Sequence, residues 1–494
     1  MHDGYIPGQG RCLRRRHEGV VHTANEEWME GTVPSVTAER LSENEQPNVE
    51  EESEGKSTTP RRVWLSLLAV IAIFVIVATV VAVKTPAYEA ADEPGHVQNI
   101  ETLVSGHWYG MNTPCRLDPR IGLLQCSGDE ANQAPLYYLL FAGWQRVIGQ
   151  PVLPSLSGPY VKVNPAFFRG ESGLFLNHSP ATHRILLLLR LPNVVLGALT
   201  VLFTFLAVRL VTADAWTPVV AASFVAFLPR MVFLTSFVTN DNLVDLLGAV
   251  LTFLALRYAL SPSGRRMTSV GIVYGLLLTT KLTTLPLVVV LVAIAFLAPG
   301  WKRRIEHFGI GVFSALIVSG WYLIQNIVRY GDPLARRTSA HYLSLLGALG
   351  TPIGKPYIVN DPLRMIVIQI PQRIVQTFWY VSDWNQFLWP WEVNLLFTLA
   401  FIGTLIGLIH RRIERRVLVT FVAISLAALL SVWVVAFQTF YQAKYAFVGL
   451  PAIAGLVALG VERWRFLARF LLPAMMLIGT LVAIQIDVLA IRWN

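Results

Sequence analysis

Long apolar segments, separated by short clusters of basic residues, constrain this chain more than any other feature. The first, VWLSLLAVIAIFVIVATVVAV, follows Arg61 and Arg62, and it is long enough to cross a bilayer as a helix, which takes about 20 apolar residues. Hydrophobic residues make up 54% of the 494 residues and charged residues only 14%, whereas soluble proteins carry roughly 25% charged residues. With a mean hydropathy of +0.52, this composition predicts an all-α polytopic membrane protein.

The basic clusters assign sides to the predicted helices, because Lys and Arg favour the cytoplasmic side of a membrane. We expect SGRRM (263–267), WKRRIEH (301–307), HRRIERR (410–416) and ERWRFLAR (462–469) to be cytoplasmic, and two apolar segments separate each pair of neighbouring clusters. About eleven transmembrane helices fit this pattern, at 64–83, 184–209, 216–236, 244–260, 268–282, 284–299, 308–327, 388–409, 417–437, 446–461 and 467–486. The N-terminus is then cytoplasmic and the C-terminus extracytoplasmic.

One further apolar segment, APLYYLLFAGWQRVIG (134–149), is not expected to cross the membrane. It is short and contains Gln145 and Arg146, and counting it would place all four basic clusters outside. We expect it to lie on the outer membrane surface or to dip into it. The first outer loop then covers 84–183. A second large outer segment covers 328–387 and includes PLRMIVIQIPQRIVQTFWYVSDW, a pattern typical of an interfacial helix.

The remaining sequence contains few signals of other folds. Residues 1–62 are polar and acidic, which predicts a disordered cytoplasmic tail before a membrane domain at 63–494. No signal peptide is recognisable, so the segment from Val63 is expected to be an uncleaved anchor. Cys115 and Cys126 lie in the first outer loop, where a disulfide and two free thiols both fit the spacing. There is no Walker loop, GxGxxG, HExxH or paired CxxC motif.

Ionisable residues at the predicted membrane boundary gather on the outer side. Asp92, Glu93 and His96 follow the first helix, Asp241 lies in SFVTNDNLVD, and Lys281 lies in LLLTTKLTTLP. Ionisable residues at such positions are costly and often functional. Simpler roles fit as well, since either aspartate could cap a helix and the lysine could extend to the interface. A cap can also hold a carboxylate that does chemistry.

Several motifs, taken in order, resemble those of the GT-C class of integral-membrane glycosyltransferases. They are DEPGHVQNIETLVSGHW (92–108), QAPLYYLL (133–140), RLPNVVLGALTVLFTFLAVRL (190–210), SFVTNDN (236–242), YGDPLA (330–335) and YQAKYAFVGLPAIA (441–454). Within this class, the motifs resemble those of the protein O-mannosyltransferase-like group and of the bacterial lipid A aminoarabinose transferases, over roughly 64–460. Departures are Gln325, Gln133 and Ala134, and Ala443-Lys444-Tyr445 where relatives often have Gly-Arg-Tyr.

This resemblance implies a GT-C-like fold, whose large first extracytoplasmic loop carries juxtamembrane helices. It also implies inverting transfer of a sugar from a polyprenyl phosphate to an acceptor hydroxyl. Asp92 is then the expected base, with a pKa raised by burial, and Glu93 orients it or binds the acceptor. Lys281, Arg329 and Lys444 would offset charge on the leaving phosphate. The expected binding residues are His96, Gln133, Tyr137, Asp241, Lys281, Arg329, Tyr330, Lys444 and Tyr445.

The expected partners are a polyprenyl-phosphate-linked sugar donor, a glycan, lipid or protein acceptor, and membrane lipids, but no nucleic acid. No cofactor is expected to be required, and a divalent cation is compatible with the class. The expected location is the plasma membrane, as a multi-pass protein with an extracytoplasmic active site. An alternative is a transporter or flippase, or a non-catalytic binder, of lipid-linked glycans. A transporter should carry ionisable residues near the bilayer midplane, whereas most lie at one edge here.

Overall fold

The computed structural model describes residues 61–88, 90, 92–111, 116–118, 123–125, 130–150, 180–341, 361–382, 387–409, 411–436, 442–462 and 465–485. All of these belong to one compact unit. Nearly all of the predicted tail at 1–62 lies outside the described residues, as do Cys115 and Cys126.

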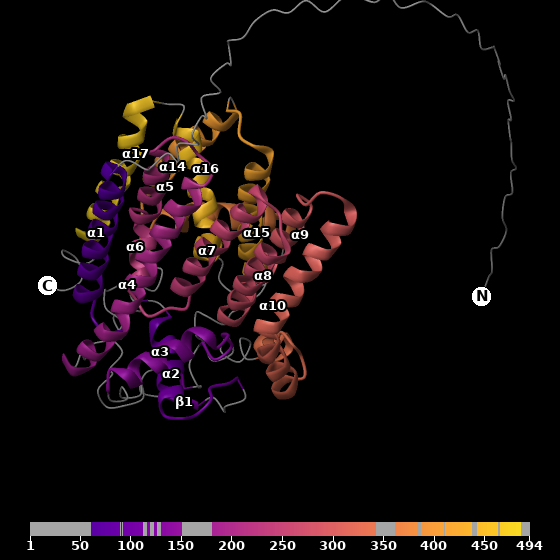
Figure 1. Ribbon diagram of the computed structural model, residues 1–494. Coiled ribbons are helices and arrows are strands. Elements are labelled where there is room, and N and C mark those ends of the chain that lie inside the picture. Colours follow the sequence, from indigo (N-terminus) through magenta and orange to yellow (C-terminus); the bar gives the residue numbers. More distant parts are fainter. Residues whose placement is uncertain are drawn as a thin grey trace, which may run out of the picture. The chain divides into compact units, whose positions relative to one another are not determined.

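Helices make up most of the described chain (Figure 1). They are α1 (Arg61–Lys84), α2 (Glu93–Val104), α3 (Leu136–Val147), α4 (Pro180–Arg209), α5 (Thr217–Ala226), α6 (Pro229–Thr235), α7 (Asp241–Leu260), α8 (Gly264–Thr280), η2 (Leu282–Leu287), α9 (Val288–Ala295), α10 (Trp301–Tyr330), α12 (Pro362–Arg364), η4 (Met365–Gln369), α13 (Ile370–Trp379), α14 (Trp391–Ile409), α15 (Arg415–Ala436), η6 (Ala443–Gly449), α16 (Leu450–Val461) and α17 (Arg465–Ile484). The helices η2 and η6 are 3-10 helices, and η4 is a single stretch of π-helix.

Four short strands form two antiparallel pairs in the described chain. They are β1 (Arg116–Asp118) with β2 (Leu123–Gln125), and β3 (Val381–Ser382) with β4 (Phe387–Leu388). In the first pair Leu117 lies opposite Leu124, and in the second Val381 lies opposite Leu388.

Seven described segments are long and apolar enough to cross a membrane. They are Arg61–Lys84, Thr182–Arg209, Asp241–Leu260, Trp301–Tyr330, Trp391–Ile409, Arg415–Val435 and Ala443–Val461. The pair α5 and α6 gives an eighth if it is counted as one span bent by 61°. The other three predicted spans, 268–282, 284–299 and 467–486, are helical over most of their length but do not meet this measure. By helix length and composition, the described residues therefore contain seven or eight candidate transmembrane segments rather than the predicted eleven or so.

Local backbone geometry explains two of the shorter segments. Leu228 is extended (φ −72°, ψ 114°) just before Pro229, so α6 begins in a new direction, as expected where a proline cannot continue a helix. Lys281 is also extended (φ −161°, ψ 120°) and separates α8 from η2. Both breaks place a basic residue, Arg230 or Lys281, inside the helical unit rather than at its surface.

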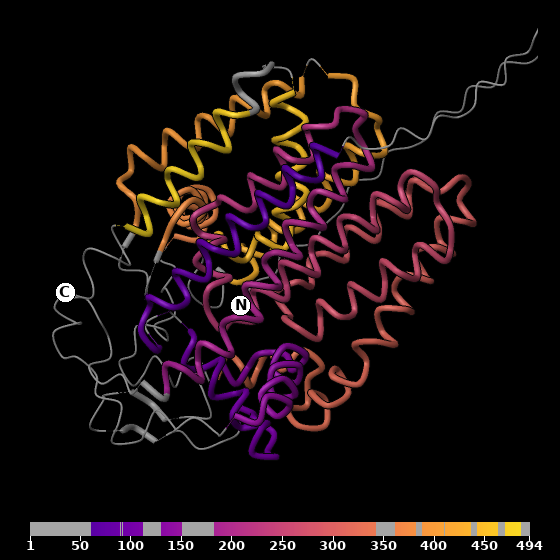
Figure 2. The backbone as a smooth tube through the Cα atoms, turned by 60° about the vertical axis from the view of Figure 1, so that its left-hand side comes forward, coloured from indigo at the N-terminus to yellow at the C-terminus, as the bar shows by residue number. Residues whose placement is uncertain are grey.

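Two helices lie across one end of the membrane-spanning helices. In Figures 1 and 2, α2 and α3 lie together at that end, and they pack against each other. Helix α3 has only 12 residues, too few for a crossing of about 20 residues. The prediction that 134–149 does not span is consistent with this length. Its placement at the outer membrane surface stays a prediction.

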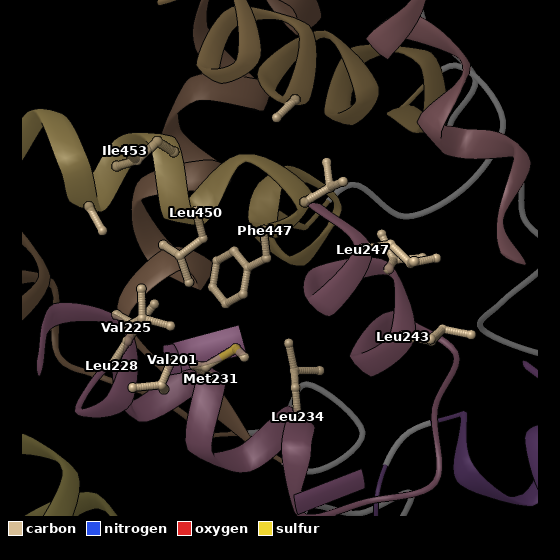
Figure 3. Close-up of a cluster of buried hydrophobic side chains, with 14 of the residues drawn as sticks. Val201, Val225, Leu228, Met231, Leu234, Leu243, Leu247, Phe447, Leu450 and Ile453 are labelled. Atoms are coloured by element: carbon tan, nitrogen blue, oxygen red, sulfur yellow. The ribbon is translucent and has the colours of Figure 1, made fainter. Parts of the chain in front are cut away.

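Close packing in the middle of the unit brings distant segments together. Helix α10 packs along α8, α4 along α7, and α7 along η6. At Gly248 of α7, an added Cβ would lie 2.1 Å from the Val448 carbonyl oxygen of η6, so glycine permits this approach. Figure 3 shows Phe447 and Leu450 among apolar side chains of α4 to α7. This packing holds η6 against α7.

Candidate active site

A buried salt bridge fixes the start of α2. Arg190 of α4 donates to both Glu93 carboxylate oxygens, with Nε–Oε1 at 2.9 Å and Nη2–Oε2 at 2.6 Å, and both side chains are 0% exposed. Arg190 also donates to three backbone carbonyls at or just after the end of α1. Glu93 accepts a further bond from the Val238 backbone N–H. The geometry gives Glu93 a structural role, because its oxygens are occupied by these donors.

The neighbouring carboxylate, Asp92, points elsewhere. Asp92 adopts a left-handed backbone conformation (φ 67°, ψ −14°), which is uncommon and costly for a residue other than glycine. It occupies the N-cap position of α2, but its side chain makes no capping hydrogen bond. Instead Lys444 Nζ donates to Asp92 Oδ2 at 2.6 Å. The Asp92 side chain remains 30% exposed, so it is accessible.

Asp241, Lys281 and Lys444 extend this contact into a chain of alternating charges. Lys444 Nζ lies 3.6 Å from Asp241 Oδ2, and Lys281 Nζ lies 2.5 Å from Asp241 Oδ1. Their side chains are 7%, 5% and 4% exposed for Lys444, Lys281 and Asp241 respectively. We call Asp92, Lys444, Asp241 and Lys281 the charged array. It joins the start of α2, η6, the start of α7 and the break after α8.

Two neighbours support the charged array. Tyr445 presents its ring to both lysines, whose Nζ atoms lie 5.2 Å (Lys281) and 5.6 Å (Lys444) from the ring centre, within the range of a cation–π contact. Asn240 Oδ1 accepts from Lys281 at 3.2 Å. The simpler role considered for Lys281 was extension of its side chain to the membrane interface. The side chain is instead held in these buried contacts.

His96 lies beside the charged array in a neutral form. Its Nδ1 lies 2.8 Å from the Tyr138 hydroxyl and its Nε2 lies 3.3 Å from Thr239 Oγ1. Burial lowers the pKa of His96 to about 3, although the Asp92 charge acts in the opposite direction. Both ring nitrogens lie within hydrogen-bond distance of neutral hydroxyl groups.

The pKa of Asp92 differs from the expectation. Burial by itself would raise the pKa of this carboxyl, but the charge and the hydrogen bond of Lys444, together with His96 and Lys281, outweigh it, so the pKa lies below its usual value. The expected rise is therefore wrong for this arrangement. The physical reason is the ammonium group in direct contact, which favours the ionised carboxylate.

Glu130, which the sequence did not single out, is a further carboxyl beside the charged array. Burial and the Asp92 charge raise the pKa of Glu130 to about 7, while Lys281 and Lys444 act against this rise. Its backbone carbonyl accepts from Asn99 Nδ2 of α2 at 2.7 Å. The Gln133 side chain, three residues later, accepts a hydrogen bond from Asn240 Nδ2 at 3.1 Å. Asn240 also accepts from Lys281, so it connects residues 130–133 to the charged array.

Arg329 and Tyr330 line a separate cavity next to the charged array. Its lining also includes Trp108, Gln133 and Asn326. The Arg329 guanidinium lies 5.3 Å from the Trp108 ring centre, and the Tyr330 hydroxyl accepts from the Met111 backbone N–H at 3.3 Å. Gln133 contacts both the cavity and the array through Asn240. Arg329 and Tyr330 are thus near the array without belonging to it.

Tyr137 is placed in the core rather than in an open groove. Its side chain is 0% exposed, its hydroxyl donates to Asn193 Oδ1 at 2.9 Å, and its ring stacks on Phe141 with ring centres 4.2 Å apart. No ring face is left for a sugar in this arrangement. Tyr138, also 0% exposed, contributes through its contact with His96 instead.

Some buried ionisable residues were not expected from the sequence, among them Arg190, Arg230 and Asp245. Arg190 and Arg230 interrupt the apolar runs LLLLRLPNVV and FLPRMVF, and Asp245 lies one turn after Asp241. All are at most 7% exposed. Neither Asp245 carboxyl oxygen has a hydrogen-bond partner in the described part of the chain. An ionisable residue within an apolar segment was the signal that could have identified all three.

In the described part of the chain, the carboxylates of the charged array lie beside cations rather than beside one another. In the described residues, no group of three or more His, Cys, Asp or Glu side chains could hold a metal ion. The Asp92 and Asp241 carboxylates instead contact lysine ammonium groups.

Comparison with known proteins gives resemblance at the level of structure. No protein-family model and no curated protein sequence matches the chain. Similar solved structures include ArnT from Cupriavidus metallidurans bound to undecaprenyl phosphate, at 13% identity and a TM-score of 0.45, with 87% of this chain and 65% of ArnT covered. They also include the Archaeoglobus fulgidus oligosaccharyltransferase, at 15% identity and a TM-score of 0.43, with 86% and 55% covered.

The chain therefore spans less than two thirds of each of these proteins. ArnT is a lipid A aminoarabinose transferase, and it and the oligosaccharyltransferase are both GT-C glycosyltransferases. Both are membrane proteins to which the chain is similar in structure.

Proposed function

We propose that this protein is an inverting glycosyltransferase that moves a sugar from a polyprenyl phosphate to a cell-envelope acceptor hydroxyl at the extracytoplasmic end of the membrane domain. The observation that carries the proposal is the charged array. Asp241, Lys281 and Lys444 are almost fully buried within it, while the Asp92 side chain is 30% exposed. An accessible carboxylate with a fixed ionised state is suited to receive a proton.

In the proposed reaction, the acceptor oxygen attacks the anomeric carbon from the face opposite the phosphate. The acceptor proton passes to Asp92, and the new glycosidic C–O bond forms. The bond between the anomeric carbon and the phosphate oxygen breaks, and its electron pair leaves with the polyprenyl phosphate. The configuration at the anomeric carbon inverts. General base catalysis of this kind typically contributes about 10²–10⁴-fold to the rate.

Lys444 explains how a carboxylate with a low pKa can still act as the base. In the described contacts Lys444 is shared between Asp92, at 2.6 Å, and Asp241, at 3.6 Å. A bound phosphate would attract the Lys444 ammonium and weaken its bond to Asp92. Because that bond lowers the Asp92 pKa, weakening it makes the carboxylate a stronger base. Donor binding would thus activate the base.

Glu93 and Glu130 take different parts in this proposal. The two Glu93 oxygens are held by Arg190 and the Val238 N–H, so Glu93 positions α2 and with it Asp92. Glu130, with a pKa of about 7, changes charge near neutral pH. Its negative charge and that of Asp92 repel each other, so an ionised Glu130 increases the proton affinity of Asp92.

The test is a transfer assay with the purified full-length protein in proteoliposomes. A panel of polyprenyl-phosphate sugars is supplied together with an acceptor extract of the cell envelope, and released polyprenyl phosphate is measured. Asp92→Asn should lower the rate by at least about 100-fold while the protein remains folded. Glu392→Gln, which removes a carboxylate from an exposed site on α14, is the matched control. Full activity of Asp92→Asn would remove the proposed base, and binding without turnover by the unaltered protein would favour a non-catalytic binder.

A further inference from the structure

Arg230 differs from the other buried lysine and arginine residues that the structure describes. Four Lys or Arg side chains are buried there, namely Arg190, Arg230, Lys281 and Lys444. Three of them form salt bridges with Glu93, Asp241 or Asp92. Among the described residues, no carboxylate lies within salt-bridge distance of Arg230, whose side-chain bonds go to the Val381 carbonyl and to Gln442.

The guanidinium of Arg230 also has unused capacity to donate hydrogen bonds. Nη2 donates to Gln442 Oε1 at 3.0 Å, and Nη1 donates to the Val381 carbonyl oxygen. Nε is buried and has no partner in the part of the chain that the structure describes. A buried charge that faces only neutral dipoles is costly. An anion bound to the Arg230 guanidinium would balance its charge and accept the unused hydrogen bond of Nε.

Arg230 belongs to the same neighbourhood as the charged array. Gln442, its hydrogen-bond partner, lies two residues before Lys444 at the start of η6. The charge of Arg230 acts on the carboxylates of Asp241 and Asp92 and on the ammonium of Lys444. Within the array, two carboxylates balance two lysines. Arg230 therefore adds a positive charge beside an array that is already balanced.

We propose that Arg230 binds the phosphate group of the lipid-linked donor, an inference that rests on the function proposed above. A guanidinium presents several N–H groups in a planar fork that matches phosphate oxygens. Arg230 lies in the bent pair α5 and α6, which together are long and apolar enough to cross a membrane, so a ligand that reaches it is expected to carry an apolar chain. The family resemblance alone implies this role for Lys281, Arg329 and Lys444.

In this assignment, Arg230 holds the phosphate before and after transfer. The two lysines keep their carboxylate partners in the unliganded protein, and Lys444 alone exchanges Asp92 for a phosphate oxygen. The electron pair that leaves the anomeric carbon then remains on a phosphate already paired with a permanent cation. Because arginine stays protonated across the working pH range, this site does not titrate together with Asp92 or Glu130.

The experiment measures binding of radiolabelled undecaprenyl phosphate, without a sugar, to the full-length protein in detergent. Arg230→Gln should weaken binding by about 10- to 100-fold, the loss expected for hydrogen bonds to a charged group. Arg230→Lys, which keeps the charge but not the fork, should bind with intermediate affinity. Arg336→Gln, which removes a charge from an exposed position, should bind as the unaltered protein does. Thermal unfolding of each variant shows that the protein is folded.

Competition identifies the source of the phosphate. Phosphatidylglycerol, which carries the same chemical group on a bilayer lipid, should displace undecaprenyl phosphate poorly. Equal displacement would indicate a general headgroup site and would overturn the donor assignment. Unchanged binding by both Arg230 variants would also overturn it. These results are separable from the proposed function. Sugar transfer with normal binding by Arg230→Gln rejects the inference alone, and binding through Arg230 with no transfer from any donor rejects the function alone.

Discussion

Lys444 donates a 2.6 Å hydrogen bond to Asp92 from a position 352 residues further along the chain. The bond forms because η6 packs against α7 and reaches the start of α2 beside the first spanning helix. It contributes to the ionisation of Asp92: burial would raise the pKa of that carboxyl, but the charge and hydrogen bond of Lys444, together with His96 and Lys281, lower it below its usual value. The ionisation of a carboxylate just after α1 therefore depends on a lysine of η6.

Removing the Lys444 charge should shift the pH dependence of transfer. Lys444 lowers the pKa of Asp92, so Lys444→Met should raise that pKa and move the acidic limb of the kcat/KM profile to higher pH. Lys444→Arg, which keeps the charge, should leave the limb close to its original position. The measurement is the rate of sugar transfer between pH 4 and pH 9. If the unaltered protein and both variants gave the same profile, the acidic limb would not report the ionisation of Asp92.

Breaking the Glu93–Arg190 bridge should destabilise the protein. Both side chains are 0% exposed, and removal of one partner leaves a buried, unpaired charge that costs roughly 3–5 kcal/mol. Arg190→Gln should therefore lower the unfolding temperature strongly, and Glu93→Gln should do the same. The double variant should lose less than the sum of the two single losses. Additive losses measured by thermal unfolding would show that the two residues act independently.

Glu130 should make stability depend on pH. Its pKa is raised to about 7 by burial and by Asp92, so the folded protein holds the proton more tightly than the unfolded chain does. Its contribution to stability is fully present below the ordinary glutamate pKa and is lost as the pH rises through about 7. Glu130→Gln should flatten this dependence between pH 5 and pH 8. Unfolding temperatures across that range, with and without the substitution, provide the check.

Gly248 should be needed for the position of Lys444. A Cβ at this site would meet the Val448 carbonyl oxygen at 2.1 Å, so Gly248→Ala should push η6 away from α7. The expected results are a lower unfolding temperature and a loss of sugar transfer that exceeds the loss of folded protein. Gly309→Ala on α10, where nothing lies within 4 Å of the added Cβ, should be neutral or slightly stabilising. Equal behaviour of the two variants would contradict the packing argument.

The sequence identified the members of the array better than their arrangement. Asp92, Asp241, Lys281 and Lys444 stood out because charged residues are conspicuous beside apolar segments, and the structure brings all four together. Tyr137 and Glu93 were expected at the site from the family resemblance, whereas the structure places the Tyr137 side chain in the core and Glu93 in a buried salt bridge. Adjacent side chains diverge at the left-handed Asp92, which sequence patterns do not reveal.

The sequence by itself determined that this is a helical membrane protein and where most of its apolar segments lie, because the length and apolar character of a helix that can cross a membrane are fixed by the bilayer. Only the tertiary structure decided which charges pair. Lys444 with Asp92 and Arg190 with Glu93 join residues far apart in the chain, and Arg230 is left without a carboxylate partner among the described residues. Pairing depends on helix breaks and close contacts between helices, which the hydrophobic pattern does not encode.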